Sequence, residues 1–317
     1  MSAQRQTGGP AGLEGGALAS SIAVGVCALV GLVFMAILGC STTVSTAPAQ
    51  QLTRQGPVPS LNLQVKTAPV KAVAEPLPTP PPKVDPLWEN AKREALERII
   101  PFYVHNKPEL MRGLERYQIE RGLPWCREVA LTFDDGPHPE STPKLLEVLR
   151  KYNAKATFFV VGSMARKHPE LVAAEVAEGH AVGNHTYNHR NMTSISPEEA
   201  AIELRACGDV LRDITGAPTR LFRPPGGRYS RETVALARAE GYTTVFWTVN
   251  TADYTEPSET RVAQRVLWGA SNGAVFLLHD GYQETIDALP RILQNLQSRG
   301  YRFVTVNDFI GDRLTKM

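Results

Sequence analysis

Two adjacent carboxylates, Asp134 and Asp135, follow an apolar run and directly precede Gly136-Pro137. Asp favours turns on its own account, so the pair is compatible with a solvated turn. It is equally compatible with hydrolytic chemistry, in which one carboxylate binds a metal ion and the other accepts a proton. Neighbouring side chains on a strand point to opposite faces, so we expect the two carboxylates to have different surroundings.

Two histidines are candidate metal ligands. His185 and His189 are four residues apart, a spacing that places both imidazoles on one side of a helical turn. Alone, such a pair is typical of surface histidines. One Asp from a neighbouring strand would complete a set of three ligands and leave a coordination position open, as a hydrolytic zinc site requires.

Two further polar residues end apolar runs. His279 follows Val275-Phe276-Leu277-Leu278 and is either a buried structural residue or a general acid. Arg223 precedes Pro224-Pro225-Gly226-Gly227 and is either a surface cation or the partner that keeps one Asp ionised.

Alternating strands and helices would bring these residues together. The pattern predicts strands at 128–133, 156–161, 180–184, 220–223, 243–249, 274–279 and 302–305. Helix start signals between them include Ser141-Thr142-Pro143 and a capping box at Ser196-Pro197-Glu198-Glu199. This order predicts a parallel α/β fold, either a barrel or a doubly wound sheet. In a barrel, the carboxyl ends of the strands form the face that carries the active site.

The N-terminal region predicts a membrane attachment and a tether. Residues 17–39 are almost entirely apolar, long enough to span a bilayer, and end in Ile37-Leu38-Gly39-Cys40, which resembles a bacterial lipobox. A lipoprotein signal with a lipid on Cys40 and an uncleaved anchor remain alternatives, and both place the rest of the chain outside the cytoplasm. Residues 41–86 hold ten of the 24 prolines and predict an extended linker.

Helical periodicity then begins at Trp88 and continues to Pro101, and a second helix is expected near Pro108. We therefore divide the chain into a signal or anchor (1–40), a linker (41–86), a helical lead-in (87–124) and a catalytic domain (125–312).

The amino-acid composition limits the classes of binding partner that we expect. The 34 basic and 32 acidic residues give a net charge of +2, which does not indicate nucleic-acid binding. No protein partner is evident, and we expect a monomer. Cys126 and Cys207 could form a disulfide or remain thiols.

The polar clusters together resemble the polysaccharide deacetylase family (carbohydrate esterase family 4, the NodB-homology domain) over about residues 128–309. The resemblance implies a distorted (β/α) barrel of about seven parallel strands with one divalent metal, usually Zn²⁺, although Co²⁺ or another transition metal is possible. It implies that Asp134 is the general base. It also implies three metal ligands, Asp135, His185 and His189.

The remaining motifs imply further roles. By the resemblance Arg223 orients the base, His279 is the general acid, and Leu277 contacts substrate. Gly226 would offer its N–H to the oxyanion, although the family normally has an aromatic residue there. The fourth motif usually reads Asp, two residues, Asp, Trp, and here Asn250, Asp253 and Tyr254 stand at those places.

In the family the first of these acids partners the catalytic histidine. We therefore expect Asn250 to hydrogen-bond His279 and to leave it with a lower pKa. Tyr254 would replace the tryptophan as an aromatic lid.

The expected function is metal-dependent deacetylation of an N-acetylated cell-envelope polysaccharide, either peptidoglycan or another GlcNAc-containing glycan. We expect the protein in the cell envelope, outside the cytoplasm and anchored to the membrane. One alternative is an O-acetyl polysaccharide esterase. The other, of a different class, is a wall-binding lipoprotein without catalytic activity.

Overall fold

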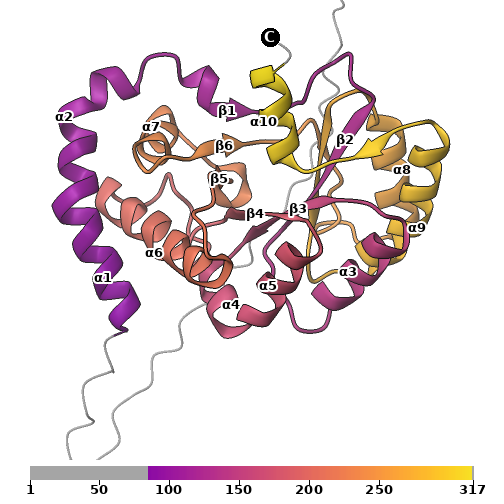
Figure 1. Ribbon diagram of the computed structural model, residues 1–317, viewed down its shortest axis with the longest axis horizontal. Helices are drawn as coiled ribbons and strands as arrows, with labels where there is room; N and C mark the ends of the chain where they lie inside the picture. The colour runs from indigo at the N-terminus through magenta and orange to yellow at the C-terminus, as the bar shows by residue number, and fades with distance from the viewer. Residues whose placement is uncertain (1–84, 316–317) are drawn as a thin grey trace, which may run out of the picture. The chain divides into compact units, whose positions relative to one another are not determined.

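The computed structural model describes residues 85–315 (Figure 1). The expected signal or anchor, Cys40 and nearly all of the linker lie outside these residues. Within them, no helix is both long and apolar enough to cross a membrane. The strands are β1 (Gln118–Ile119), β2 (Glu128–Asp134), β3 (Ala156–Val160), β4 (Ala181–Asn184), β5 (Leu221–Phe222), β6 (Thr243–Val245), β7 (Val249–Asn250), β8 (Ala274–His279) and β9 (Arg302–Phe303).

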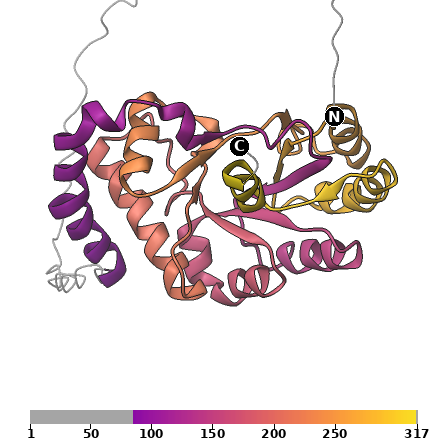
Figure 2. The same ribbon diagram turned by 45° about the horizontal axis from the view of Figure 1, so that its top comes forward.

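Helices surround the sheet (Figures 1 and 2). They are α1 (Pro86–Glu94), the π-turn η1 (Ala95–Ile99), α2 (Ile100–Leu110), α3 (Thr142–Lys151), α4 (Gly162–Lys167), α5 (Pro169–Ala177), α6 (Pro197–Thr215), α7 (Arg231–Ala239), α8 (Glu259–Gly269), α9 (Gln283–Ser298) and α10 (Val306–Thr315), with short 3₁₀ turns η2 (Leu114–Tyr117) and η3 (Pro225–Gly227). The predicted capping box at Ser196 and Glu199 is present at the start of α6.

The strands form one parallel sheet in the order β1-β6-β5-β4-β3-β2-β8-β7, and β9 pairs with the start of β2. The expected distorted (β/α) barrel of parallel strands is confirmed. All seven residues of β2 are buried, as expected for a parallel strand covered on both faces. The register aligns Asp134 at the end of β2 with His279 at the end of β8, which brings two candidate residues to one edge.

The strand expected at 243–249 is instead two strands at opposite ends of the sheet. β6 pairs with β5 and β1, whereas β7 pairs with β8. Val245 and Val249 are four residues apart, so their Cα atoms are separated by at most about 14 Å. The two ends of the sheet are therefore close, and the chain itself links them across the gap in the barrel.

The lead-in forms a longer helical stretch than expected. Pro101 does not end the helix, because the π-turn η1 precedes it and α2 continues to Leu110. A π-turn shifts hydrogen bonds to the fifth preceding residue, as in the bond from Ile100 N–H to Ala95 O. We infer that this wider turn accommodates the proline ring, which in a regular helix would clash with an earlier carbonyl.

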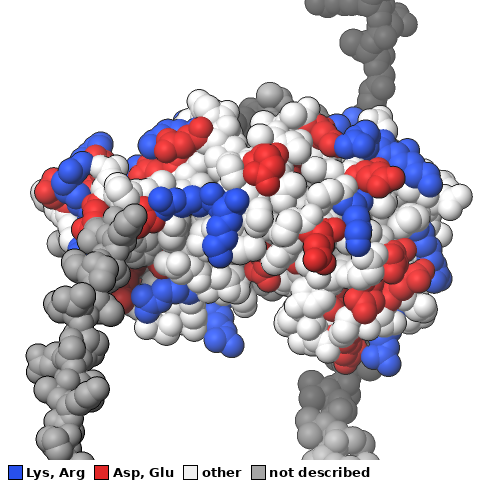
Figure 3. Space-filling view, turned by 90° about the horizontal axis from the view of Figure 1, so that it is seen from below, with Lys and Arg blue, Asp and Glu red and all other residues white. Residues whose placement is uncertain are grey.

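The lead-in packs on the barrel through the predicted apolar face. Ala91, Ala95 and Ile99 are buried, and α1 and α2 contact α6 and α7 respectively. Elsewhere, Cys126 and Cys207 are not joined by a disulfide, and burial raises the pKa of the Cys207 thiol to about 12. On the molecular face in Figure 3, basic and acidic side chains are interspersed.

Asp85 connects the start of α1 to the barrel. Its Oδ1 accepts a hydrogen bond from Leu87 N–H and caps the helix, and its Oδ2 accepts from Tyr187 Oη at 3.3 Å. The same carboxylate forms an ion pair with Arg166. The indole of Trp88 contacts the Tyr187 ring, with centroids 5.4 Å apart.

We predict that Asp85→Ala destabilises the protein by about 1 kcal/mol, because it removes a helix cap, and lowers the Tm by roughly 2–4 °C. Thermal unfolding followed by circular dichroism measures the change. Glu97→Ala, at an exposed position of the neighbouring turn, is the control. Equal Tm values for Asp85→Ala and the unchanged protein would contradict the prediction.

Candidate metal and active site

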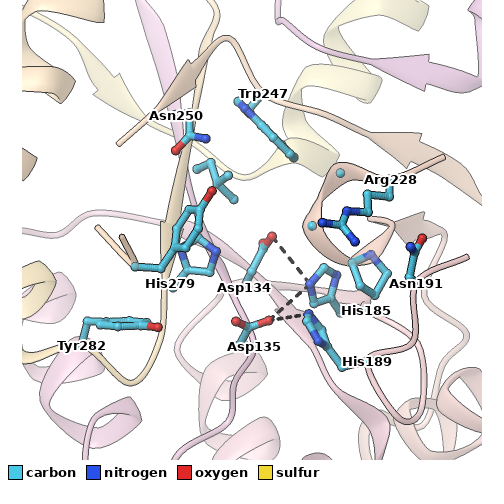
Figure 4. Close-up of a pocket in the computed structure, with 15 residues that line it drawn as sticks. Asp134, Asp135, His185, His189, Asn191, Arg228, Trp247, Asn250, His279 and Tyr282 are labelled. Carbon is cyan, nitrogen blue, oxygen red and sulfur yellow. Dashed lines mark ion pairs between the residues drawn. The ribbon is translucent and has the colours of Figure 1, made fainter. Parts of the chain in front are cut away.

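Three predicted ligands converge at the carboxyl edge of the sheet (Figure 4). Asp135 Oδ1 lies 3.0 Å from His189 Nε2 and 3.4 Å from His185 Nε2. In a tetrahedral site with bonds of about 2.0–2.2 Å, neighbouring ligand atoms lie roughly 3.4 Å apart. Asp135 Oδ1 is also buried without a geometrically satisfactory hydrogen bond. The donor set, its spacing and this oxygen fit a divalent metal ion.

The backbone at these ligands is neither the strand expected for the two carboxylates nor the helical turn expected for the two histidines. Asp135 has φ 73° and lies beyond the end of β2, so this turn, rather than strand alternation, directs its side chain. His185 and His189 are on a loop and not on a helical turn, and His189 has φ 55°. Left-handed backbone at a residue other than glycine costs about 1–3 kcal/mol. As a result, both Asp side chains reach the same cavity.

Hydrogen bonds hold the histidine loop in this conformation. Asn184 Oδ1 accepts from the N–H of Thr186, a β-branched residue with φ 65°. The buried Glu203 of α6 accepts from both the backbone and the side-chain amide of Asn188, at 2.7 and 2.9 Å. His185 Nδ1 lies 2.7 Å from the Arg223 carbonyl and must donate to it, which leaves Nε2 with its lone pair towards the site.

Arg223 is a fully buried cation beneath the cavity. Its guanidinium donates to Asp134 Oδ1 and to Thr132 Oγ1, both at 2.7 Å, and to two backbone carbonyls. Arg223 thus pairs with the free carboxylate, as expected, and Asp134 is only 3% exposed. The two carboxylates therefore have different partners, as predicted, although turn geometry produces the difference.

The expectation for Asn250 is wrong. His279 Nδ1 lies 2.8 Å from Asp253 Oδ1, and Asp253 Oδ2 accepts from the His279 N–H and from Thr285 Oγ1. Asn250 is exposed, and its Oδ1 accepts from the Ala252 N–H instead. The carboxylate partner is thus the second acid of the motif and not its first position.

The expected direction of the His279 pKa is also wrong. Burial alone would lower this pKa, but the hydrogen bond to Asp253 and the negative charge of Asp134 outweigh it, so the pKa lies above its ordinary value. The ring of Tyr254 stands edge-on to His279, with centroids 4.7 Å apart, where an aromatic lid was expected.

One cavity of about 440 Å³ collects the predicted residues, except Arg223, which lies below it. It is lined by Asp134, Asp135, His185, His189, Gly226, Asn250, Tyr254, Leu277 and His279. Sequence reasoning assigned no role to several other lining residues, including Asn191, Arg228, Trp247 and Tyr282. Asn191, Arg228 and Tyr282 closely follow a motif in sequence and Trp247 closely precedes one, and that proximity is the only signal that could have identified them.

Comparisons with known proteins point to one family. The model of the family described as "Polysaccharide deacetylase" matches residues 124–245. A peptidoglycan-N-acetylglucosamine deacetylase of Bacillus cereus is 38% identical over 187 residues, which cover 57% of this chain and 87% of that protein. The corresponding Listeria monocytogenes enzyme PgdA is 37% identical over 188 residues, or 59% of this chain, and the match spans only 40% of its length.

Solved structures share the fold. A peptidoglycan N-acetylglucosamine deacetylase, crystallised with a substituted benzamide, has a TM-score of 0.60 and 34% identity, covering 62% of this chain and 94% of its own. A family pseudoenzyme from Bacillus anthracis has a TM-score of 0.58 and 31% identity, covering 61% and 68%. Because both resemble this chain to a similar degree, fold similarity does not distinguish an enzyme from a pseudoenzyme.

We predict that His185→Ala weakens binding of Zn²⁺ or Co²⁺ by more than about 100-fold, because even losing a residue that only orients a ligand costs 10–100-fold. Asp134→Asn is the matched control, and its affinity should stay within a few-fold of the unchanged protein, because Asp134 pairs with Arg223. Calorimetric titration of the metal measures both. Equal losses in the two variants would contradict the division of roles between the carboxylates.

We also predict that Asp253→Asn lowers the pKa of His279 by about one unit or more, since a hydrogen bond to a charged group contributes about 1.5–3 kcal/mol. His279 would then lose its proton at a lower pH, and its charged form would occupy a narrower range. NMR titration of the imidazole in metal-free protein measures this pKa. Asn250→Ala should leave it unchanged, and a shift of similar size there would favour the original assignment.

Proposed function

The chain belongs to the polysaccharide deacetylase family, and from this premise we propose that it hydrolyses the acetamido group of an N-acetylated cell-envelope polysaccharide. One observation supports the proposal most directly. Three side chains that could hold a metal ion, a carboxylate paired with Arg223 and a histidine paired with Asp253 all lie at one cavity. The reaction consumes one water and gives acetate and the free amine.

Asp134 acts as the general base in this proposal. Its Oδ1 is held by Arg223, while its Oδ2 lies 3.8 Å from His185 Nε2, on the side of the metal ligands. The arginine fixes the orientation of the carboxylate and compensates its negative charge. Asp134 is therefore ready to remove a proton from a water molecule that attacks the acetyl carbonyl.

His279 acts as the general acid. Its Nδ1–H is engaged with Asp253, so Nε2 is the atom that can give a proton to the departing sugar nitrogen. The raised pKa keeps a larger share of the imidazole protonated near neutral pH. The C–N bond can then break to release an amine rather than an unstable amide anion.

Asp135, His185 and His189 would hold the divalent ion, for which we propose Zn²⁺. When bound, such an ion polarises the acetyl carbonyl and makes a water molecule more acidic. Gly226 lines the same cavity, and in our proposal its N–H donates to the developing oxyanion. Leu277 and Tyr254 would contact the sugar.

The similarity to peptidoglycan deacetylases supports a cell-wall substrate and a location outside the cytoplasm. Attachment through the N-terminal segment, by a lipid on Cys40 or by an uncleaved anchor, remains part of the proposal. So do the monomeric state and the four-part division of the chain.

The test is acetate release by zinc-loaded protein from N-acetylchitooligosaccharides, peptidoglycan and O-acetylated xylan. We expect release from an N-acetylated substrate, and Asp134→Asn should reduce kcat by about 10²–10⁴-fold, the usual contribution of general base catalysis. Release from xylan alone would favour an esterase. Saccharide binding without any acetate release would contradict the proposal and favour a wall-binding protein.

A further inference from the structure

Arg228 is a cation at the cavity that holds the candidate metal ligands. It is exposed and lines the same cavity as the metal ligands and His279. Of the other charged residues there, Asp134 is paired with Arg223 and Asp135 belongs to the ligand set. Among residues 85–311, whose side chains the structure describes, no ion pair or hydrogen bond engages the Arg228 guanidinium.

The side chain of Arg228 lies over Gly226. A Cβ atom at Gly226 would be 4.0 Å from both Cγ and Nε of Arg228, and Gly226 has φ 62°, which disfavours any larger residue. Where the sequence comparison with the family leads one to expect an aromatic wall, this chain has a glycine with a guanidinium beside it. The surface offered to a sugar at Gly226 therefore includes a cation, and the ring of Trp247 lies against the neighbouring Gly227.

Asn191 adds a second donor on this wall. Its Oδ1 already accepts from the N–H and the hydroxyl of Thr193, at 3.1 and 2.9 Å, which fixes the orientation of the amide. Its Nδ2 has no acceptor among the described residues. In Figure 4, Asn191 and Arg228 lie across the metal ligands from His279 and Tyr282. The two side chains thus offer hydrogen-bond donors and no free acceptor.

A guanidinium and an amide N–H₂ on the same side of one cavity match a carboxylate, which only accepts hydrogen bonds. We propose that Arg228 and Asn191 form a specificity site for a carboxylate carried by the saccharide, close to the acetamido group that is hydrolysed. This inference rests on the proposed function and narrows its substrate to acidic N-acetylated glycans. A lactyl ether and a uronic acid are two possible sources of this group.

Calorimetry on zinc-loaded protein carrying Asp134→Asn, which slows turnover, measures binding apart from catalysis. The probes are a neutral N-acetylchitooligosaccharide, a glycan strand with free lactyl carboxylates, the same strand as methyl esters, and an oligosaccharide that alternates N-acetylglucosamine with glucuronic acid. We expect tighter binding of at least one acid than of the neutral saccharide, and weaker binding of the ester than of the free lactyl strand if the lactyl group is the source.

Adding Arg228→Gln should weaken binding of the preferred acid about 5- to 20-fold and leave the neutral saccharide unchanged. Arg228→Lys should retain part of the preference. Asn191→Asp keeps the acceptor for Thr193 but replaces the amide donor with a negative charge. It should therefore also weaken binding of the acidic saccharide and leave binding of the neutral one unchanged. Arg261→Gln, at an exposed position outside the cavity, is the control and should change neither the affinity for the acid nor that for the neutral saccharide.

Equal affinities for acidic and neutral saccharides in the parent protein would overturn the inference. Equal losses for both saccharides in Arg228→Gln would do the same, because they would indicate a contact with the sugar ring or a structural role. Neither result depends on acetate release, so a failure of the proposed function is seen separately in the turnover of the protein with an intact Asp134.

Discussion

The active face depends on the burial of one guanidinium. Arg223 is fully buried, and removing one partner of such a pair typically costs about 3–5 kcal/mol, because the other charge remains without compensation. Its bonds to Thr132 and Asp134 on β2, and to the carbonyls of Val245 and Phe246, tie together strand ends from different parts of the sheet. Its own carbonyl orients His185. One residue thus links the proposed base, a candidate metal ligand and the gap in the barrel.

A second buried group organises the other side of the cavity. Asp253 binds both the ring and the backbone N–H of His279, and Thr285 at the start of α9 binds Asp253 in turn. The imidazole therefore has a fixed tautomer and a fixed orientation. The proposed base and the proposed acid are each held by an oppositely charged or polar partner, and the two assemblies are joined through the aligned ends of β2 and β8.

The sequence was sufficient to predict which polar residues gather at one cavity, because polar residues that end apolar strands of a parallel barrel must share one edge. It did not reveal how the chain turns there. The left-handed backbone at Asp135 and His189 depends on contacts with distant residues, such as the bonds between Glu203 and Asn188 for the histidine loop. The wrong partner was predicted for His279 for the same reason. The spacing of the motif leaves both Asn250 and Asp253 as candidates, and only the path of the backbone after β7 brings Asp253 to the imidazole.

Two predictions from local sequence patterns were wrong because a neighbouring element altered the conformation of the segment. Pro101 is a reliable helix terminator in a regular helix, but the π-turn before it removes the conflict. The run at 243–249 has the composition of a single strand, yet its two ends belong to opposite ends of the sheet. In both cases the deciding interaction lies outside the segment that carries the pattern.

The attachment of α1 to the barrel extends the packed structure beyond the part of the chain that matches the family model. The match to the family model begins at residue 124, whereas contacts with the barrel already include Asp85, the first described residue. Ala95, Ile99 and Tyr103 of the intervening helices share a core with Leu204 of α6 and Leu236 of α7. Tyr187, which Asp85 and Trp88 contact, stands between the two histidine ligands in sequence. Among the described residues, the packed unit is therefore larger than the part that matches the family model, and the helices before residue 124 contact the residue between the two candidate histidine ligands.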